Sequence, residues 1–328
     1  MATLNDVAKL AGVSPATVSR VMNRSVVVSE STRVRVLEAA RELEYELPAV
    51  SRPAADKIIL VVSDISNPER SQAFYRSIAE AGYQMVQFYY CEGPNTEQDL
   101  LLFLQAHRSL KISGIILDNF VRPVGSALLA ELNRYPVVQL SGRCPLNRII
   151  SVDLDSFQTG FEATKLLLER GAKRIALFHS SGSYQVMDQQ RLNGYSSALR
   201  TFEVPFDPAL VIDIDFLAEN SFKRMTELVS SGEPLPDAFI CPLDFIAIAC
   251  LQVLKEAGYK VPEQIQIISL KDDWNCQYAS PALTAVEYPV SAICSEAVRF
   301  LQRLIRGEKL HNQQIGFQGV FHMRQSTK

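Results

Sequence analysis

The sequence from Thr3 to Asn23 is TLNDVAKLAGVSPATVSRVMN. Thr3, followed three residues later by Asp6, is typical of a helix N-terminus, because each side chain can bond to the other residue's backbone N–H. Apolar residues then recur at the spacing of one helix face, at Leu4, Val7, Ala8 and Leu10 or Ala11. Gly12 is suited to end such a helix. The stretch therefore predicts a short first helix with one buried face.

A second short helix is predicted three residues later. Ser14 is a favoured N-cap residue, and Pro15 occupies the first helical position, where a missing N–H costs nothing. Val18 and Val21 would face inward. The outer and N-terminal face would carry Pro15, Ala16, Thr17, Ser19 and Arg20. Two helices with this spacing and this polar outer face are typical of a helix-turn-helix that enters the major groove of DNA.

A third helix is predicted after Ser29, which is a good N-cap for the sequence ESTRVRVLEAARELEY. Its apolar positions near i, i+3 and i+7 are Val34, Leu37, Ala40 or Arg41, and Leu43 or Glu44. Three such helices can enclose a small core. The first two helices could instead form a purely structural hairpin, but that interpretation does not account for the Ser/Thr/Arg surface of the second one.

Composition indicates where any affinity for nucleic acid must lie. The chain has 328 residues, 47% of them hydrophobic, which is enough for more than one domain and a sizeable core. Its formal net charge is only −3, so binding would need a local basic patch. The candidates in the first sixth of the chain are Lys9, Arg20, Arg24, Arg33, Arg35 and Arg52. Alternatively these residues solvate a helical surface, since Glu38, Glu42, Glu44 and Glu46 nearly balance them in number.

Cysteine and histidine usage argues against a metal site or a disulfide framework. The six cysteines are scattered, without a C-x-x-C pair or a histidine at ligand spacing: Cys91, Cys144, Cys241, Cys250, Cys276 and Cys294. We expect reduced thiols and neither metal nor cofactor. No leader opens the chain and no apolar run approaches membrane length, so we expect a cytoplasmic protein without a membrane partner.

From Ile58 onward, strand and helix patterns alternate. KIILVVSD is a continuous apolar run, as expected of a parallel strand that is covered on both faces. The same form returns at 84–90, 113–118, 136–140, 174–179, 238–241 and 266–270. Helical stretches separate these runs, at 71–81, 97–109, 125–134, 159–170, 189–202, 218–230, 245–257 and 290–306. Repeated βα units predict doubly wound sheets, with ligands bound beyond the carboxyl ends of the strands.

The headpiece residues 3–23 and the pattern SESTRxxVLxAAxELxY ending at Tyr45 resemble the DNA-binding headpiece of LacI/GalR-family repressors. The rest of the chain resembles the periplasmic-binding-protein-like effector domain of that family. The motifs that carry this resemblance are SDISNP, ISGIILD, LLERGAKRIALF, QRLNGYSSAL, EAGYKVPEQIQIISL and SPALTAVEYP. Together they cover nearly the whole chain.

The resemblance implies an α/β fold of two doubly wound parallel-sheet subdomains, periplasmic binding protein-like type I, after an N-terminal all-α helix-turn-helix domain. The implied domains are a headpiece at 1–46, a hinge at 47–57 and an effector-binding and dimerisation domain at 58–328. Within the last, the N-subdomain is about 58–156 and 287–317, and the C-subdomain about 157–286 and 318–328. The chain would cross between them near Ser156, Glu287 and Gln318, with a small effector in the cleft.

The effector contacts of the family carry over only in part. Arg191 matches the family's effector-contacting arginine and Asp155 its acidic contact. Lys271 stands where the family has an aspartate that accepts hydrogen bonds from sugar hydroxyls. Leu243-Asp244 replaces an Asn-Asp pair, Glu69-Arg70 replaces two aromatic residues, and the helix after Pro68 is about one turn shorter than usual. The predicted effector site is therefore Glu69, Arg70, Asp155, Arg191, Leu243, Asp244 and Lys271.

Lys271 beside Arg191 favours an anionic effector, such as a sugar acid or sugar phosphate, because lysine supplies a point charge and arginine a fork suited to carboxylate or phosphate. The alternative is that Lys271 pairs with Asp272, Asp273 or Asp155 and never meets a ligand.

The resemblance also implies a set of DNA contacts, in which Arg20 would bond to guanine. The set is Thr3, Ser14, Pro15, Ala16, Thr17, Ser19, Arg20, Asn23, Arg24, Thr32, Arg33, Val50, Arg52 and Ala54. The hinge departs from the family, because Ala54 stands at the position of a leucine that wedges into the minor groove, and Pro53 disfavours helix at Arg52. We therefore expect a truncated hinge helix and a weaker kink in the DNA, or none.

These observations together predict a repressor of a carbohydrate-utilisation operon, controlled by a small effector. It would be a homodimer that reads a pseudo-palindrome in double-stranded operator DNA, and it would lack the extra helix that makes some relatives tetramers. A sugar-modifying enzyme is the first alternative, but G-x-S-x-G, P-loop and G-x-G-x-x-G motifs are missing and His107, His179, His311 and His322 have no partner spacing. A cytosolic or exported sugar-binding protein is the second, and it has no use for the headpiece.

Overall fold

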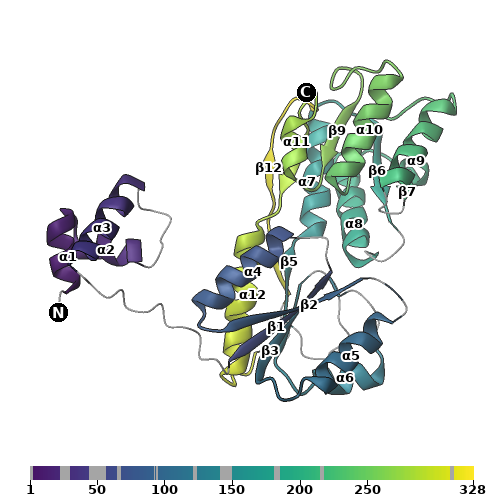
Figure 1. Ribbon diagram of the computed structural model, residues 1–328. Coiled ribbons are helices and arrows are strands. Elements are labelled where there is room, and N and C mark those ends of the chain that lie inside the picture. Colours follow the sequence, from purple (N-terminus) through teal and green to yellow (C-terminus); the bar gives the residue numbers. More distant parts are fainter. Residues whose placement is uncertain are drawn as a thin grey trace. The chain divides into compact units, whose positions relative to one another are not determined.

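The chain forms two compact units, residues Met1–Lys57 and Ile58–Lys328. The computed structural model describes residues 3–22, 30–43, 57–64, 68–91, 93, 95–120, 124–140, 150–180, 185–214, 218–310 and 314–328. Figure 1 shows their helices and strands. Among these residues, no helix is both long and apolar enough to span a bilayer.

The smaller unit contains the three predicted helices, α1 (Leu4–Ala11), α2 (Pro15–Met22) and α3 (Glu30–Glu42). α1 begins with the predicted capping box: the Thr3 hydroxyl accepts the Asp6 N–H at 3.3 Å, and the Asp6 carboxylate accepts the Thr3 N–H at 2.8 Å. It ends at Gly12, whose φ of +65° is left-handed. At the start of α2 the Ser14 hydroxyl accepts the Thr17 N–H at 3.1 Å, which confirms Ser14 as the cap. The predicted cap of α3, Ser29, lies outside the described residues.

The headpiece core confirms the inward face of α2 but corrects that of α3. Its buried apolar residues are Val7, Ala8, Ala11, Val18, Val21, Val36, Ala39 and Ala40. Val34 and Leu37, expected inside, are 45% and 39% exposed. The spacing of α3 allowed either of two faces, and the face that packs is the one with two alanines, whose small side chains let the helices approach closely.

The larger unit contains two sheets, and we call the part built on the first sheet the N-lobe. The six strands of this sheet are all parallel, in the order β11-β5-β4-β3-β1-β2. The strands are β1 (Ile58–Asp64), β2 (Gln84–Tyr90), β3 (Ile112–Asp118), β4 (Val137–Leu140), β5 (Ile150–Leu154) and β11 (Gln314–Phe317). Helices α4 (Pro68–Glu80) and α12 (Val290–Ile305) cover one face of this sheet. Helices α5 (Thr96–Ala106) and α6 (Ser126–Leu132) cover the other (Figure 1).

The second sheet organises the C-lobe, with the order β12-β10-β9-β8-β6-β7 and an antiparallel β12 at one edge. Its strands are β6 (Ile175–His179), β7 (Val211–Asp213), β8 (Ala238–Cys241), β9 (Gln266–Ser269), β10 (Thr284–Glu287) and β12 (Val320–His322). One face packs on α7 (Ser156–Glu169) and α8 (Gln185–Thr201). The other packs on α9 (Ala218–Ser230), α10 (Asp244–Glu256) and α11 (Trp274–Tyr278), and a 3₁₀ turn (Pro208–Leu210) precedes β7.

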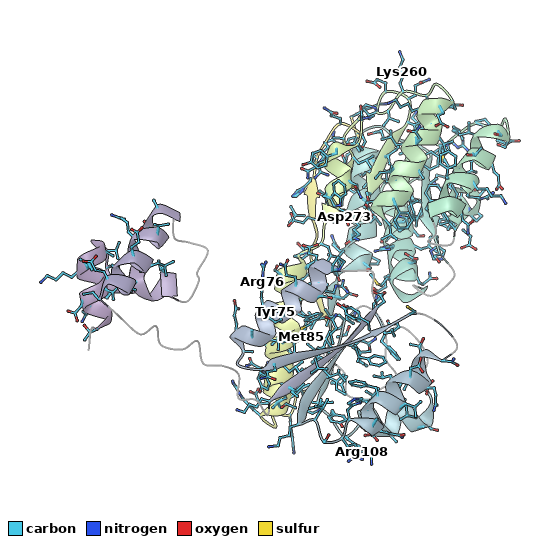
Figure 2. The ribbon with its side chains drawn as sticks, in the orientation of Figure 1. Tyr75, Arg76, Met85, Arg108, Lys260 and Asp273 are labelled. Carbon is cyan, nitrogen blue, oxygen red and sulfur yellow. The ribbon has the colours of Figure 1, made fainter. Side chains whose placement is uncertain are left out.

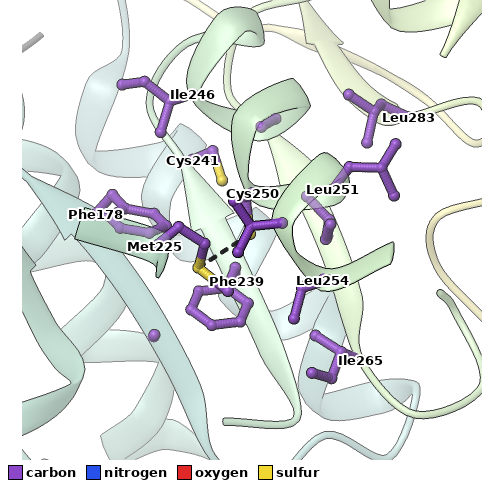
Figure 3. Packing of buried hydrophobic residues seen from close by; sticks show 14 of the residues in the cluster. Phe178, Met225, Phe239, Cys241, Ile246, Cys250, Leu251, Leu254, Ile265 and Leu283 are labelled. Carbon is purple, nitrogen blue, oxygen red and sulfur yellow. Dashed lines mark hydrogen bonds between the residues drawn. The ribbon is translucent and has the colours of Figure 1, made fainter. Parts of the chain in front are cut away.

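The core under α9 and α10 contains sulfur-bearing side chains among aromatic and aliphatic ones. Figure 3 shows the contact between Met225 and Cys250 in this cluster, which also contains Phe178 and Phe239. The five described cysteines are all free. Burial raises the pKa of Cys276 to about 11, so its thiol stays protonated and unreactive at neutral pH.

The chain passes between the lobes three times. The first passage follows β5 at Asp155, the second joins β10 to α12, and the third joins β11 to β12. Each lobe is therefore assembled from separated parts of the sequence.

The predicted fold class and all seven predicted strands are confirmed, with strand ends within about one residue. Five short strands (β5, β7, β10, β11, β12) and the short helix α11 were missed, although β4, β8 and β9, which have four residues each, were predicted. β2 was expected to be covered on both faces and is instead a mostly half-exposed edge strand.

Candidate functional site

The predicted DNA-binding surface can be followed on part of the headpiece. Ser14 and Pro15 are exposed at the start of α2, and Thr17 is half-buried beside them, with its hydroxyl 2.8 Å from that of Ser14. Thr3 is exposed at the start of α1, and Thr32 is half-buried on α3. The other predicted contacts lie outside the described residues, or have side chains that do: Ala16, Ser19, Arg20, Asn23, Arg24, Arg33, Val50, Arg52 and Ala54.

A cavity of about 840 Å³ lies in the larger unit and is lined from both lobes. The N-lobe and its passages contribute Asp64, Glu69, Arg70, Asp118, Asn119, Glu287, Tyr288 and Val290. The C-lobe contributes Met187, Arg191, Pro242, Leu243, Asp244, Phe245, Leu270, Lys271, Asp272, Asp273, Trp274, Asn275, Gln277 and His322. We call this space the interlobe cavity. Figure 2 shows Asp273 on the side of the C-lobe that faces the N-lobe.

The position of the cavity follows from the sheets. Asp64 and Asp118 are the last residues of β1 and β3, and Pro242 and Leu270 directly follow β8 and β9. Parallel strands end at the same edge of their sheet, so each lobe presents such an edge to the cavity.

Six of the seven predicted effector contacts line the interlobe cavity: Glu69, Arg70, Arg191, Leu243, Asp244 and Lys271. Asp155 is not among the lining residues. It is the N-cap of α7, and its carboxylate accepts the N–H of Gln158 at 2.9 Å.

Arg70 forms part of a buried network in the N-lobe wall. Its guanidinium donates to Asp118 at 2.5 Å and lies over the ring of Tyr288, 5.1 Å from the centroid. The hydroxyl of Tyr288 in turn donates to Asp153 on β5. Burial raises the pKa of Asp118, and the Arg70 charge offsets part of that shift. Arg70 thus ties α4, β3 and a passage between the lobes into a fixed wall.

Arg191 is held in the opposite wall. It is 7% exposed, and its guanidinium donates to Asp188 at 2.8 Å, one turn earlier on α8. Burial raises the pKa of Asp188, and Arg191 partly offsets this as well. A Cβ on Gly160 of α7 would lie 2.3 Å from the carbonyl oxygen of Arg191, so the two helix backbones are in close contact at this residue.

Lys271 adopts the pairing that the sequence left open. Its ammonium lies 3.4 Å from the carboxylate of Asp273, and both side chains are more than a third exposed. Lys271 still lines the cavity, but its charge already has a partner.

Carboxylates outnumber cations in the cavity lining. The seven carboxylates are Asp64, Glu69, Asp118, Asp244, Asp272, Asp273 and Glu287, against three cations, Arg70, Arg191 and Lys271. Each of these cations has a carboxylate within 3.4 Å. His322 lies between two of these seven carboxylates, with Nδ1 2.7 Å from Asp272 and Nε2 3.0 Å from Glu287. The lining is therefore rich in hydrogen-bond acceptors, which suits the hydroxyl groups of a ligand. No group of three His, Cys, Asp or Glu within the described ranges is arranged to hold a metal ion.

Several lining residues were missed by sequence analysis. Asp64 and Asp118 end apolar strand runs, so the rule on strand ends could have found them. Trp274 and His322 lie on a short helix and a short strand that gave no periodic signal.

A helical headpiece joined to a two-lobed α/β unit with a cavity between its lobes defines a ligand-binding protein with a DNA-binding domain. Residues 3–47 match the family model "Bacterial regulatory proteins, lacI family", and residues 164–327 match "Periplasmic binding protein-like domain". The chain belongs to the LacI family and is a transcription regulator.

Named relatives match along nearly their full length. The transcriptional regulator DegA of Bacillus subtilis is 30% identical over 99% of this chain and 98% of its own. The transcriptional repressor CytR of Escherichia coli K12 is 31% identical over 94% and 91%. A solved complex of the transcriptional regulator CelR with cellobiose is 30% identical, covers 99% of this chain and 100% of its own, and superposes with a TM-score of 0.70.

Proposed function

We propose that the protein represses a carbohydrate-utilisation operon and that a neutral saccharide in the interlobe cavity controls its affinity for the operator. The observation that carries the effector class is the lining itself. The seven lining carboxylates outnumber the three lining cations, and each of these cations already has a carboxylate partner, although Asp118, Asp272 and Asp273 are themselves in ion pairs. The similar CelR chain was solved with cellobiose, which supports a saccharide.

This proposal departs from the anionic effector that the sequence favoured. An anion would have to displace Asp273 from Lys271 or Asp188 from Arg191, and it would meet the surplus carboxylates. Unpaired like charges in a cavity cost free energy that a neutral polyol avoids. A sugar acid or sugar phosphate is thus the less favoured ligand.

For the DNA side, we propose a cytoplasmic homodimer that places two headpieces on a pseudo-palindrome in double-stranded DNA. One helix-turn-helix covers only a half-site, and a dyad supplies the second. The exposed Ser14 and Pro15 at the start of α2 would lie at the groove, and Arg20 would bond to guanine. With Ala54 in the hinge, we expect the operator to be bent less than by relatives that have the leucine.

The test begins with selection of operators from random duplex DNA by the full-length protein. The selected operator is then titrated in gel shifts with glucose, galactose, cellobiose, maltose and lactose, and with gluconate, glucuronate and glucose 6-phosphate. We expect at least one neutral sugar to change operator affinity about tenfold or more, and the anions to have no effect.

Arg20→Ala tests whether Arg20 recognises a base in the operator. It should weaken the selected operator far more than random DNA, since base readout by arginine is worth about 1–3 kcal/mol. Equal losses on both duplexes would make Arg20 a phosphate contact. If only the anions act, the neutral assignment is wrong. If no duplex is selected, the proposal that the protein represses an operon by binding its operator is wrong.

A further inference from the structure

Trp274 is the single tryptophan of the chain, and it lies at the interlobe cavity. We propose that its indole is a stacking platform for a second ring of the effector, which makes the effector a disaccharide or larger glycoside. This inference rests on the proposed function and specifies its ligand.

The exposure of Trp274 is the first observation. The side chain is 66% exposed although it is the largest apolar group in the cavity lining. Trp274 is the first residue of α11, where its backbone N–H donates to the Asp273 carboxylate at 2.7 Å, and its ring centroid lies 6.1 Å from that of the exposed Tyr278. A solvent-facing indole at the lining of a cavity can bury its face against a ligand.

The depth of the cavity is the second observation. Arg70, Arg191 and Asp244 are each at most 8% exposed, so both lobes contribute buried polar side chains to the lining that can form hydrogen bonds with the hydroxyls of a sugar. Trp274 lies at the exposed rim. The volume of about 840 Å³ is in the upper part of the range of roughly 300–1,000 Å³ found for sites of drug-sized ligands.

The chemistry around the indole matches a sugar ring. One face of a pyranose presents C–H groups and is apolar, whereas its edge carries hydroxyls. Trp274 offers a flat apolar face, and the neighbouring Asp273 and Asn275, both in the lining, offer hydrogen-bonding groups for that edge. Asn275 donates to the buried Asp244 at 3.2 Å, so this surface continues into the buried polar lining, and a ligand of two rings would contact both.

Tyr278 supplies a matched control. It lies on the same short helix and is 73% exposed, but it is not among the cavity lining residues. Substitutions at either position remove an exposed aromatic side chain from α11, so general effects on the helix should be equal.

The first experiment uses the fluorescence of the single tryptophan in the full-length protein. Cellobiose, maltose and lactose are compared with glucose and galactose. We expect the disaccharide that changes operator affinity to shift the emission of Trp274 and to protect it from quenching by acrylamide. The monosaccharides should do neither.

The second experiment measures the affinity of that disaccharide by calorimetry. Trp274→Ala should weaken binding about tenfold or more, because truncating a buried aromatic anchor is among the costliest changes at a binding surface. Trp274→Phe should restore most of the loss, and Tyr278→Ala should leave the affinity unchanged. Operator binding without sugar should be the same for all of these proteins.

The outcomes separate this inference from the proposed function. If a saccharide controls operator binding but Trp274→Ala binds it normally, the inference is wrong and the function stands. If a monosaccharide alone produces the full change in operator affinity, the inference is again wrong and the proposed function stands. If Trp274→Ala and Tyr278→Ala both change the subunit number in sedimentation, the aromatic pair belongs to a subunit interface and the inference is wrong. If no saccharide binds, both fail.

Discussion

Lys271 and Arg191 carry the same charge in the same cavity, yet their environments differ, so their ion pairs contribute differently to stability. Lys271 is paired with Asp273 at an exposed site, whereas Arg191 is 7% exposed and paired with Asp188, which is 1% exposed. An exposed ion pair contributes about 0–1 kcal/mol to stability. Removing one partner of a buried pair typically costs about 3–5 kcal/mol, because the other charge is left without compensation.

We therefore expect Lys271→Ala to change the affinity for the neutral effector by less than about twofold, with unfolding unchanged within about 0.5 kcal/mol. Arg191→Ala should lower both affinity and stability. Calorimetry and denaturant unfolding of the two variants provide the comparison. A large loss of gluconate or glucuronate binding in Lys271→Ala would instead revive the anionic effector.

The sequence alone located six of the residues that line the cavity, but not the pairing of their charges. Arg70, Arg191 and Lys271 were all selected, and all three line the cavity. The partner of Arg70 is Asp118, 48 positions away, and only the sheet brings the two together. Asp155 was selected by its distance from Gly160, but in the structure it is the N-cap of α7, where its carboxylate accepts the N–H of Gln158. Local spacing does not distinguish a cap from a ligand contact.

At the scale of elements, α7 and α8 depend on two glycines at their crossing. A Cβ on Gly194 would lie 2.0 Å from the carbonyl oxygen of Phe157, and one on Gly160 would lie 2.3 Å from that of Arg191. Because backbone atoms form both contacts, a side-chain rotation cannot relieve them. This contact also fixes the segment of α8 that carries Arg191 into the cavity.

Gly194→Ala should destabilise the larger unit by about 1–3 kcal/mol, even though alanine favours helix over glycine. Gly93→Ala is a suitable control, because its new Cβ would find its nearest neighbour at 3.8 Å. Thermal unfolding of both variants measures the loss of stability. Effector titration below the unfolding transition then measures whether the displaced α8 weakens binding in the cavity. Equal stability of the two variants would show that the helices can separate at no cost.

Long βα units were predictable because their apolar runs and helical faces have the lengths that periodicity needs. The face of α3 was not, since Val34 and Leu37 have a helical spacing as good as that of Val36 and Ala39. The edge strand β12 has three residues and takes its place from β10, to which it pairs in antiparallel register. Such elements are specified by their neighbours rather than by their own sequence.

For the whole molecule, the proposed dimer makes operator binding bivalent. When one headpiece is bound, the second is held near the other half-site, and such linkage commonly raises affinity by about 10²–10⁴. An operator with one scrambled half-site should therefore bind at least about a hundredfold more weakly than the selected pseudo-palindrome. Gel shifts at fixed ionic strength, with sedimentation to count subunits, test this. Equal affinity for both duplexes would indicate that the protein binds DNA as a monomer.

The three passages of the chain between the lobes also govern how the protein can fold while it is being made. The N-lobe completes its sheet with β11 and covers one face with α12, but residues 290–317 are synthesised after most of the C-lobe. At about 5–20 residues per second, a ribosome needs roughly ten to thirty seconds to travel from the end of β5 to β11. During that time Ile59, Ile116 and Val138, which α12 helps to bury, lack part of their cover. Nascent chains should therefore need protection from aggregation until α12 and β11 have been synthesised, and a message truncated before Val290 should yield an insoluble product.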